Sequence, residues 1–185
     1  MIYKKCRTAC FTGHRELPAE YLPEISKSLE DAVVALIEQG YCCFGAGGAL
    51  GFDTLAAQTV LRLRERYPQI RLILVLPCLN QTRGWPQADI DTYEEIKRCA
   101  DKVTYTSEHY FRGCMQKRNR HLVDNSSVCI CYLTKPTAAR TTFAVVSRSG
   151  SPQVTNAINA FPFSNAFFIL LMDILPSVAG NGRTV

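Results

Sequence analysis

Short apolar runs alternate with amphipathic helical patterns along most of this 185-residue chain, and this alternation limits the fold more than any other feature. Runs typical of strands lie at residues 7–12, 41–44, 70–76, 102–105 and 127–133, and helical patterns lie at residues 23–39, 52–66, 90–100 and 111–123. Continuous apolar strands separated by amphipathic helices form a parallel sheet that is covered on both faces. The sequence therefore predicts an α/β protein.

The loops that follow the strands are the expected ligand-binding region. In open parallel sheets, ligands bind beyond the carboxyl ends of the strands, near the point where the strand order reverses. We therefore expect four loops to surround one crevice, and they lie at residues 12–15, 45–53, 77–85 and 134–140.

The second of these loops has the composition of a phosphate-binding turn. Gly45, Gly47, Gly48 and Gly51 stand between an apolar strand and a helical pattern, and Asp53 lies at the start of that pattern. Such a loop presents main-chain N–H groups and the positive end of a helix dipole to an anion, and glycine leaves room for the phosphate. We predict a phosphate cradle, with a structural turn as the alternative. Asp53 either accepts hydrogen bonds from ribose hydroxyls or only balances the dipole.

The first loop carries Thr12, Gly13, His14 and Arg15. Gly13 permits a sharp turn, and the Arg15 guanidinium can hold a phosphate or carboxylate through two parallel hydrogen bonds. His14 can donate to a phosphate oxygen or act as an acid or base near neutral pH. A loop histidine and a surface arginine without a ligand are the equally weighted alternative.

Two further segments supply candidate contacts. Trp85, the only tryptophan, follows the third strand and either stacks on a base or anchors the core. Arg118 and Arg120 share a helical pattern but cannot face the same way, so we expect one of them to reach the crevice. Asn119 is a candidate ligand contact, and fixing the loops by hydrogen bonds is its alternative role.

Composition narrows the class of protein. The length suits one domain with a sizeable core, and the net charge of +5 suits a phosphorylated ligand without forming a basic tract typical of nucleic-acid binding. The nine cysteines form no C-x-x-C pair and no zinc-finger spacing, and the N-terminus shows no secretory signal. We therefore expect reduced thiols, a cytoplasmic location and no metal site. We expect no membrane span, because the longest apolar stretch, residues 166–175, is half the length of about twenty that a bilayer requires.

Taken together, these motifs resemble the YpsA-like group of the SLOG superfamily, whose relatives include DNA-processing protein A and the LOG phosphoribohydrolases. The matching segments are Phe11–Arg15, Gly45–Asp53, Pro77–Trp85 and Lys117–Asn125. The resemblance implies a Rossmann-like fold and a nucleotide or nucleotide-derived ligand, but it implies no established reaction. The predicted fold is thus an α/β, Rossmann-like three-layer sandwich with a mostly parallel sheet.

The chain departs from this resemblance after residue 137. The resemblance calls there for a Gly-Gly-Thr phosphate loop that opens a helix, whereas the chain has Ala138-Ala139-Arg140-Thr141. Because Gly-Gly-Thr codons read one base out of register encode Ala-Ala-Arg, we hypothesise a frameshift near residue 137. We expect a nucleotide-binding Rossmann-like domain at residues 1–137 and a divergent C-terminal segment at residues 138–185, which completes that domain or is appended to it.

The sequence predicts a protein that binds or senses a nucleotide or nucleotide derivative. One alternative is a hydrolase that cleaves an N-glycosidic or phosphoester bond with His14 or Asp53 as acid or base. The chain lacks the Pro-Gly-Gly-x-Gly-Thr loop and following acidic residue of the LOG enzymes, so their mechanism is poorly supported. Another alternative is single-stranded DNA binding, which requires a basic groove with stacking aromatics.

The expected partner is a small nucleotide-like molecule rather than nucleic acid. A homo-oligomer is left open, and the sequence identifies no cofactor. The expected ligand contacts are Thr12, Gly13, His14, Arg15, Gly45, Gly47, Gly48, Gly51, Asp53, Trp85, Arg118 and Asn119.

Overall fold

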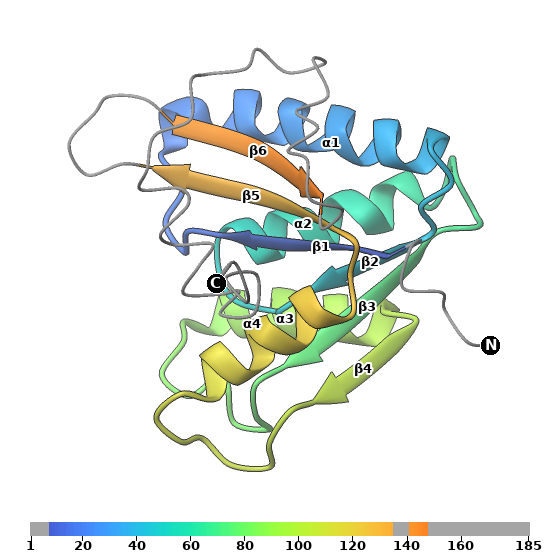
Figure 1. Ribbon diagram of the computed structural model, residues 1–185. Coiled ribbons are helices and arrows are strands. Elements are labelled where there is room, and N and C mark those ends of the chain that lie inside the picture. Colours follow the sequence, from blue (N-terminus) through green and yellow to red (C-terminus); the bar gives the residue numbers. More distant parts are fainter. Residues whose placement is uncertain (1–7, 135–140, 148–185) are drawn as a thin grey trace, which may run out of the picture.

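The computed structural model describes residues 8–134 and 141–147, which contain a six-stranded sheet (Figure 1). The strand order is β4-β3-β2-β1-β5-β6. The first five strands in this order pair in parallel, and β6 pairs antiparallel with β5. The strands are β1 (Thr8–Gly13), β2 (Cys43–Ala46), β3 (Arg71–Leu76), β4 (Lys102–Tyr105), β5 (Val128–Thr134) and β6 (Thr141–Ser147).

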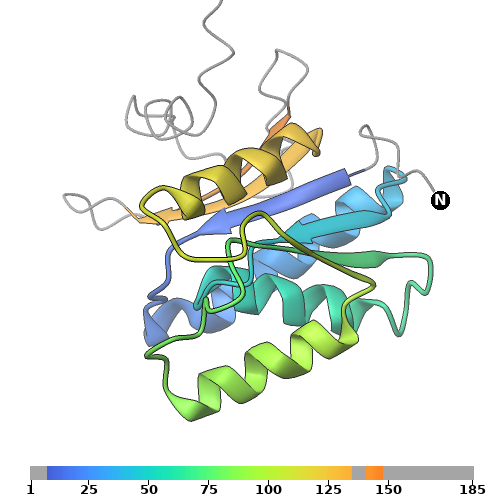
Figure 2. The same ribbon diagram turned by 90° about the horizontal axis from the view of Figure 1, so that it is seen from below.

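Helices cover both faces of the sheet. Helices α1, α2 and α3 lie on one face, and α4 lies on the other (Figure 2). The chain moves outward from β1 through β2 and β3 to β4, so crossovers of one hand place the three connecting helices on the same face. The return from β4 to β5 places α4 on the opposite face. The helices are η2 (Ala19–Tyr21), α1 (Leu22–Glu38), α2 (Phe52–Leu63), α3 (Gln87–Cys99) and α4 (Cys114–Asp124). This arrangement confirms the predicted Rossmann-like three-layer sandwich with a mostly parallel sheet.

The main core lies between the sheet and helices α1 to α3. Helix α1 contributes an apolar stripe at helical spacing, which includes the fully buried Leu29 and Val33. The rings of Phe11 in β1 and Phe44 in β2 lie 6.2 Å apart within this core. A smaller cluster lies under α4 and contains Cys10, Val75 and Leu122. None of the helices that the structure describes has the length and apolar character needed to cross a bilayer.

Several element boundaries differ from the predicted ones. Helix α4 begins at Cys114 rather than at residue 111, because Gly113 has a φ of +105° and interrupts the helical backbone. Helix α3 begins earlier than residue 90, directly after Pro86. Strand β2 ends at Ala46, two residues later than expected, so Gly45 belongs to the strand and not to the loop.

The sheet reverses its strand order between β1 and β5. The connection after β1 leads to β2 on one side, whereas β5 pairs with the other side of β1. The carboxyl ends of β1 and β5 therefore form the switch point at which open α/β sheets bind ligands. The β5–β6 loop that follows, residues 135–140, lies outside the described residues, as do residues 1–7 and 148–185.

Candidate functional site

The glycine loop, residues 47–51, joins β2 to α2 beside this switch point. A Cβ atom on Gly47 would overlap Nη1 of Arg118, and a Cβ on Gly51 would overlap the main-chain carbonyl of Arg15. Gly48 and Gly51 have φ values of +67° and +74°, which side-chain-bearing residues rarely adopt. The loop therefore requires glycine at all three positions.

Two other glycines permit close packing around the site. A Cβ atom on Gly45 would lie 2.9 Å from Cδ2 of Leu122, so this glycine lets α4 approach β2. A Cβ on Gly13 would lie 2.6 Å from Cγ of Phe52, so this glycine lets α2 approach the end of β1. The structure thus gives Gly45 and Gly13 a packing role.

A buried ion pair lies directly over the glycine loop. Arg118 of α4 donates from Nη1 to Oδ2 of Asp53 in α2 at 2.8 Å, and their side chains are only 7% and 6% exposed. The main-chain N–H of Ala49 donates to the same carboxylate oxygen at 3.3 Å. Asp53 is therefore the counter-ion that holds the guanidinium of Arg118 against Gly47.

The guanidinium of Arg118 has hydrogen-bonding capacity that the described residues do not use. Its Nε is buried and has no hydrogen-bond partner among them. Buried donors without a partner are uncommon in folded proteins, so such a group calls for an explanation. An arginine edge beside a helix N-terminus is an arrangement that binds anions through paired hydrogen bonds.

The loop after β3 also contacts the glycine loop. Gln81 is buried and donates from Nε2 to the carbonyl of Gly48, while its Oε1 has no partner within the described part of the chain. Trp85, four residues further on, packs against the main core, and its ring meets Tyr93 edge to face at 5.7 Å. Trp85 thus occupies a core-anchoring position.

The loop after β1 contacts the start of α2. The carbonyl of His14 accepts a hydrogen bond from the main-chain N–H of Phe52 at 3.0 Å. The imidazole of His14 meets the ring of Tyr132 edge to face at 6.4 Å, and Tyr132 in turn stacks on Phe52 at 5.6 Å. Tyr132 lies on β5 in register with Gly13 and is fully buried.

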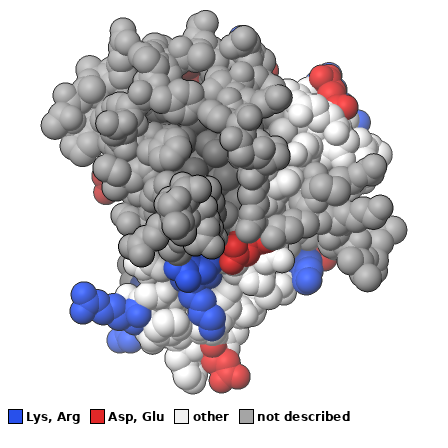
Figure 3. All heavy atoms as spheres, viewed as in Figure 1, with Lys and Arg blue, Asp and Glu red and all other residues white. Residues whose placement is uncertain are grey.

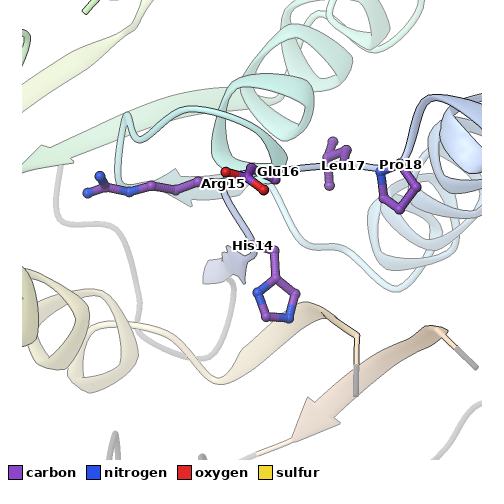
Figure 4. Close-up of a pocket in the computed structure, with 5 residues that line it drawn as sticks. All are labelled: His14, Arg15, Glu16, Leu17 and Pro18. Carbon is purple, nitrogen blue, oxygen red and sulfur yellow. The ribbon is translucent and has the colours of Figure 1, made fainter. Parts of the chain in front are cut away.

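A cavity of about 670 Å³ opens at the end of β1 (Figure 4). The described residues that line it are His14, Arg15, Glu16, Leu17 and Pro18. Figure 4 shows the imidazole of His14 and the exposed side chain of Arg15 extending in different directions. The cavity therefore combines one partly buried imidazole, two charged side chains and two apolar side chains.

Not all predicted contacts meet at this site. The structure brings together the glycine loop, Asp53, Arg118, His14 and the main chain of Arg15. Thr12 is half-buried in β1, and Asn119 is half-buried beside Arg118 on α4. Within residues 8–134 and 141–147, no group of three or more His, Cys, Asp or Glu side chains is arranged to hold a metal ion.

The YpsA family model, described as the YspA SLOG family, matches residues 9–154 of this chain. The chain belongs to the YpsA family of SLOG proteins. This match confirms the resemblance seen in the sequence motifs, and it includes the glycine loop, α4 and both β5 and β6.

Curated relatives of this chain include UPF0398 proteins. Those of Halalkalibacterium halodurans and Brevibacillus brevis are 35% and 31% identical over 104 residues, which is 55% of this chain and 55% of each relative. The chain thus spans about half the length of these two relatives. A UPF0398 protein of Bacillus thuringiensis is 23% identical over 152 residues, or 81% of this chain and 79% of the relative.

Among solved structures, one similar to this YpsA-family chain is that of DNA processing protein A from Helicobacter pylori, described for its single-stranded DNA binding mode. The TM-score is 0.46 and the sequence identity is 20%, with 71% of this chain and 55% of the other covered.

Two residues of this YpsA-family site were missed in the sequence. Gln81 lies within an expected loop, but nothing in its neighbourhood distinguishes it from the polar residues around it. Tyr132 lies in an apolar strand pattern, where an aromatic residue is normally a core residue. Only the register of β5 against β1 places its ring beside His14.

Proposed function

We propose that this YpsA-family protein binds a nucleotide or nucleotide derivative, with a phosphate group of the ligand at the glycine loop. The observation that carries this proposal is the buried guanidinium of Arg118, which Asp53 holds over Gly47 while Nε has no partner among the described residues. A fixed cation with an unused N–H edge favours a bidentate interaction with a phosphate.

The backbone beside Arg118 supports the same ligand. The main-chain N–H groups of Gly47 and Gly48 have no hydrogen-bond partner within the described residues. They precede the N-terminus of α2, where the helix dipole favours a negative charge. Arg118, these N–H groups and the dipole together would neutralise a phosphate without a metal ligand.

The hydrogen bonds that Asp53 already makes favour binding over hydrolysis. Its Oδ2 accepts hydrogen bonds from both Arg118 and the N–H of Ala49, so this carboxylate is engaged in structure rather than placed as a base.

A small ligand is favoured over single-stranded DNA as the partner of this protein. On the described part of the face in Figure 3, Lys and Arg side chains lie beside Asp and Glu side chains instead of forming a continuous basic stripe.

We infer a cytoplasmic location for this protein. Its eight cysteines among the described residues are all free thiols, which is the usual state in a reducing compartment. A homo-oligomer stays an open prediction, and light scattering of the purified full-length protein will decide it.

The proposal is tested by thermal unfolding of the full-length protein with AMP, ADP, ATP, cyclic AMP, NAD, ADP-ribose and inorganic phosphate. A ligand that binds only the folded state and is present at about 100 Kd adds about 2.7 kcal/mol to the free energy of unfolding. Chromatography of the same mixtures reports any product and so separates binding from hydrolysis. The absence of a shift with every nucleotide would overturn the proposal.

Arg118→Lys tests the residue that carries the argument. Lysine keeps the charge opposite Asp53 but loses the planar edge, so we expect nucleotide affinity to fall about tenfold to a hundredfold while the fold is retained. Arg120→Lys is the matched control, because Arg120 lies on the same helix and is exposed. Equal affinity in both variants would show that Arg118 does not contact the ligand.

A further inference from the structure

Exposed apolar side chains gather on two neighbouring loops, the β3–α3 loop (residues 77–86) and the β4–α4 loop (residues 106–113). Leu79 is 60% exposed, Tyr110 is 64% exposed and Phe111 is 44% exposed, and these three residues form what we call the apolar patch. Within the described part of the chain, only three other large apolar side chains are exposed. A group of exposed apolar side chains on a folded protein commonly marks an interaction site.

Hydrogen bonds hold the two loops together. The main-chain N–H of Leu79 donates to the carbonyl of Glu108 at 3.2 Å, and the N–H of Thr106 donates to the carbonyl of Leu76 at 2.8 Å. Lys117 of α4 donates from Nζ to the carbonyl of Thr106 at 2.6 Å. Both loops lie beyond the carboxyl ends of β3 and β4 (Figure 1). The loops that carry the apolar patch are therefore held in place, which lowers the cost of ordering them when a partner binds.

The charged side chains near the apolar patch are mainly basic. Arg112 directly follows Phe111 in the chain, Arg83 lies on the same loop as Leu79, and both arginines are exposed. Glu108 is the one acidic residue in the sequence of the two loops. Charge complementarity therefore favours an acidic partner. It disfavours a second copy of this chain, because the same basic loops would face each other.

Two features favour a polypeptide over a single-stranded nucleic acid as that partner. The patch includes the aliphatic side chain of Leu79, whereas nucleic-acid bases stack on aromatic rings. The amine of Lys117 already donates to the carbonyl of Thr106 and to the hydroxyl of Ser107, so it is engaged within the protein. Tyrosine, phenylalanine and arginine are the side chains in which protein–protein interfaces are enriched.

We propose that the apolar patch docks an acidic segment of another protein. Apolar side chains of that segment pack against Leu79, Tyr110 and Phe111, and its carboxylates face Arg83 and Arg112. This interaction goes beyond nucleotide binding and does not rest on it, because none of these five residues belongs to the glycine loop or to its ion pair.

A random peptide library displayed on phage tests the proposal without assuming a particular partner. The library is selected on the immobilised full-length protein, and the enriched peptides are then synthesised and measured by fluorescence anisotropy. We expect them to combine Asp or Glu with Leu, Phe or Tyr, and to bind more weakly as the salt concentration rises. A selection that enriches no peptide, or only peptides without acidic residues, would overturn the proposal.

The double variant Leu79→Ser with Tyr110→Ser tests the apolar patch. We expect at least about tenfold weaker binding of the selected peptides, with the unfolding temperature and nucleotide affinity close to those of the wild type, because both side chains are exposed. Tyr21→Ser with Leu22→Ser is the matched control. These side chains are 46% and 40% exposed but lie in an acidic segment, residues 20–24, so peptide binding should be unchanged. Equal peptide affinities in the two double variants would overturn the proposal.

Arg112→Gln tests the charge of the docking site. We expect about threefold to tenfold weaker peptide binding and a shallower dependence on salt, because one cation near the patch is removed. An unchanged affinity and salt dependence would contradict the role given to the basic side chains.

Two other occupants of the patch are separate outcomes of the same experiments. Binding of oligothymidylate that is lost in Leu79→Ser with Tyr110→Ser would identify a nucleic-acid surface and overturn the proposal. A dimer seen by light scattering that this variant dissociates would identify an interface between copies of the chain, and it would overturn the proposal as well.

Discussion

Residue 47 is a glycine because a side chain of the protein occupies the space where its Cβ would lie. The guanidinium of Arg118 fills that space, and Asp53 holds it there from the first turn of α2. A glycine-rich sequence is usually explained by the approach of a ligand phosphate. Here glycine is required at position 47 because another side chain of the same protein, that of Arg118, packs against it. The residue that binds the anion under our proposal is the same one that excludes a side chain at position 47.

Gly47→Ala should therefore displace Arg118 and leave the carboxylate of Asp53 buried without its counter-ion. Breaking a buried pair costs about 3–5 kcal/mol, so we expect a loss of about 3 kcal/mol or more in urea unfolding, together with loss of nucleotide binding. Gly40→Ala is the control, because it also places a side chain on a glycine but meets no atom within 4 Å. Its positive φ of +87° should cost only about 1 kcal/mol.

A double-mutant cycle with Arg118→Ala isolates the steric cause. In that background the guanidinium no longer overlaps the added Cβ, although Oδ2 of Asp53 would still lie 2.7 Å from it. Gly47→Ala should therefore cost clearly less than in the wild type, and the two substitutions should be strongly non-additive. Additive costs would show that Arg118 is not the group that a side chain at position 47 displaces.

The residues of the site differ in how far the sequence predicts them. The glycine loop, Asp53 and a single inward-facing arginine follow from local spacing, and the structure selects Arg118 because Arg120 is exposed. Gln81 and Tyr132 could not be predicted in the same way. Their positions depend on contacts with Gly48 and on the register of β5, which are tertiary facts without a local signal.

At the scale of elements, a single carboxylate connects the turn between α3 and β4 to β3 and to the end of α2. Asp101, in the turn between α3 and β4, accepts hydrogen bonds from the main-chain N–H of Leu72 in β3 at 2.9 Å and from Arg71 at 2.8 Å. It also accepts one at 3.0 Å from Arg64, the residue that ends α2. Strand β3 and the C-terminal end of α2 therefore share one acceptor.

Asp101→Asn should lower the free energy of unfolding at pH 7 by about 1–2 kcal/mol, because it weakens hydrogen bonds to a charged acceptor. Burial alone would raise the pKa of Asp101, but the Leu72 N–H together with Arg71 and Arg64 lowers it below its usual 3.8. A carboxylate with a lowered pKa stabilises the fold above its unfolded pKa, and this contribution is lost as the pH falls through the folded pKa. The difference between wild type and variant should thus be full at pH 7 and shrink below about pH 3.8, as measured by urea unfolding at pH 7, 5 and 3.

Glu94→Gln is the control for this prediction. Glu94 pairs with Lys97 on the surface of α3, and its side chain is 52% exposed. Exposed pairs of this kind contribute about 0–1 kcal/mol, so the variant should remain close to the wild type at all three pH values. A pH-independent effect of Asp101→Asn would contradict the role of its charge.

The sequence predicts whether a segment is a helix or a strand more reliably than it predicts the residues at which the segment begins and ends. Periodicity correctly predicts five strands and four helices, but Gly113 and Pro86 move the helix starts by a few residues because they act on the backbone directly. Strand β6 was missed. The family resemblance calls for a helix after residue 137, whereas Thr141–Ser147 is rich in β-branched residues and pairs with all seven residues of β5.

At the scale of the whole molecule, β6 extends the sheet beyond the predicted boundary at residue 137. The family match continues to residue 154 and so includes this strand. The division into residues 1–137 and 138–185 stays a prediction, as does the frameshift hypothesis, because residues 135–140 and 148–185 lie outside the described residues. What the structure adds is that β5 has a partner on each side, β1 and β6.

Two truncated chains measure how much β6 contributes to the thermal stability of the fold. A chain that ends at Thr134 leaves β5 as an open edge, whereas a chain that ends at Ser147 retains the antiparallel pairing. We expect the shorter chain to unfold at least about 5 °C lower and to aggregate more readily, since the unpaired edge exposes main-chain donors and acceptors. Thermal unfolding followed by circular dichroism compares the two. Identical unfolding temperatures would show that the fold does not depend on β6.

The contact between helices from opposite sides of the sheet has a consequence for how this protein can change over evolution. Asp53, Arg118 and Gly47 contact one another, so a substitution of any one of the three alone should lower the stability of the fold. A relative with a bulkier residue at position 47 must carry a shorter side chain at position 118, and an acid at position 53 then loses its counter-ion. The three positions should therefore vary together or not at all, even though 65 residues separate the acid from the base.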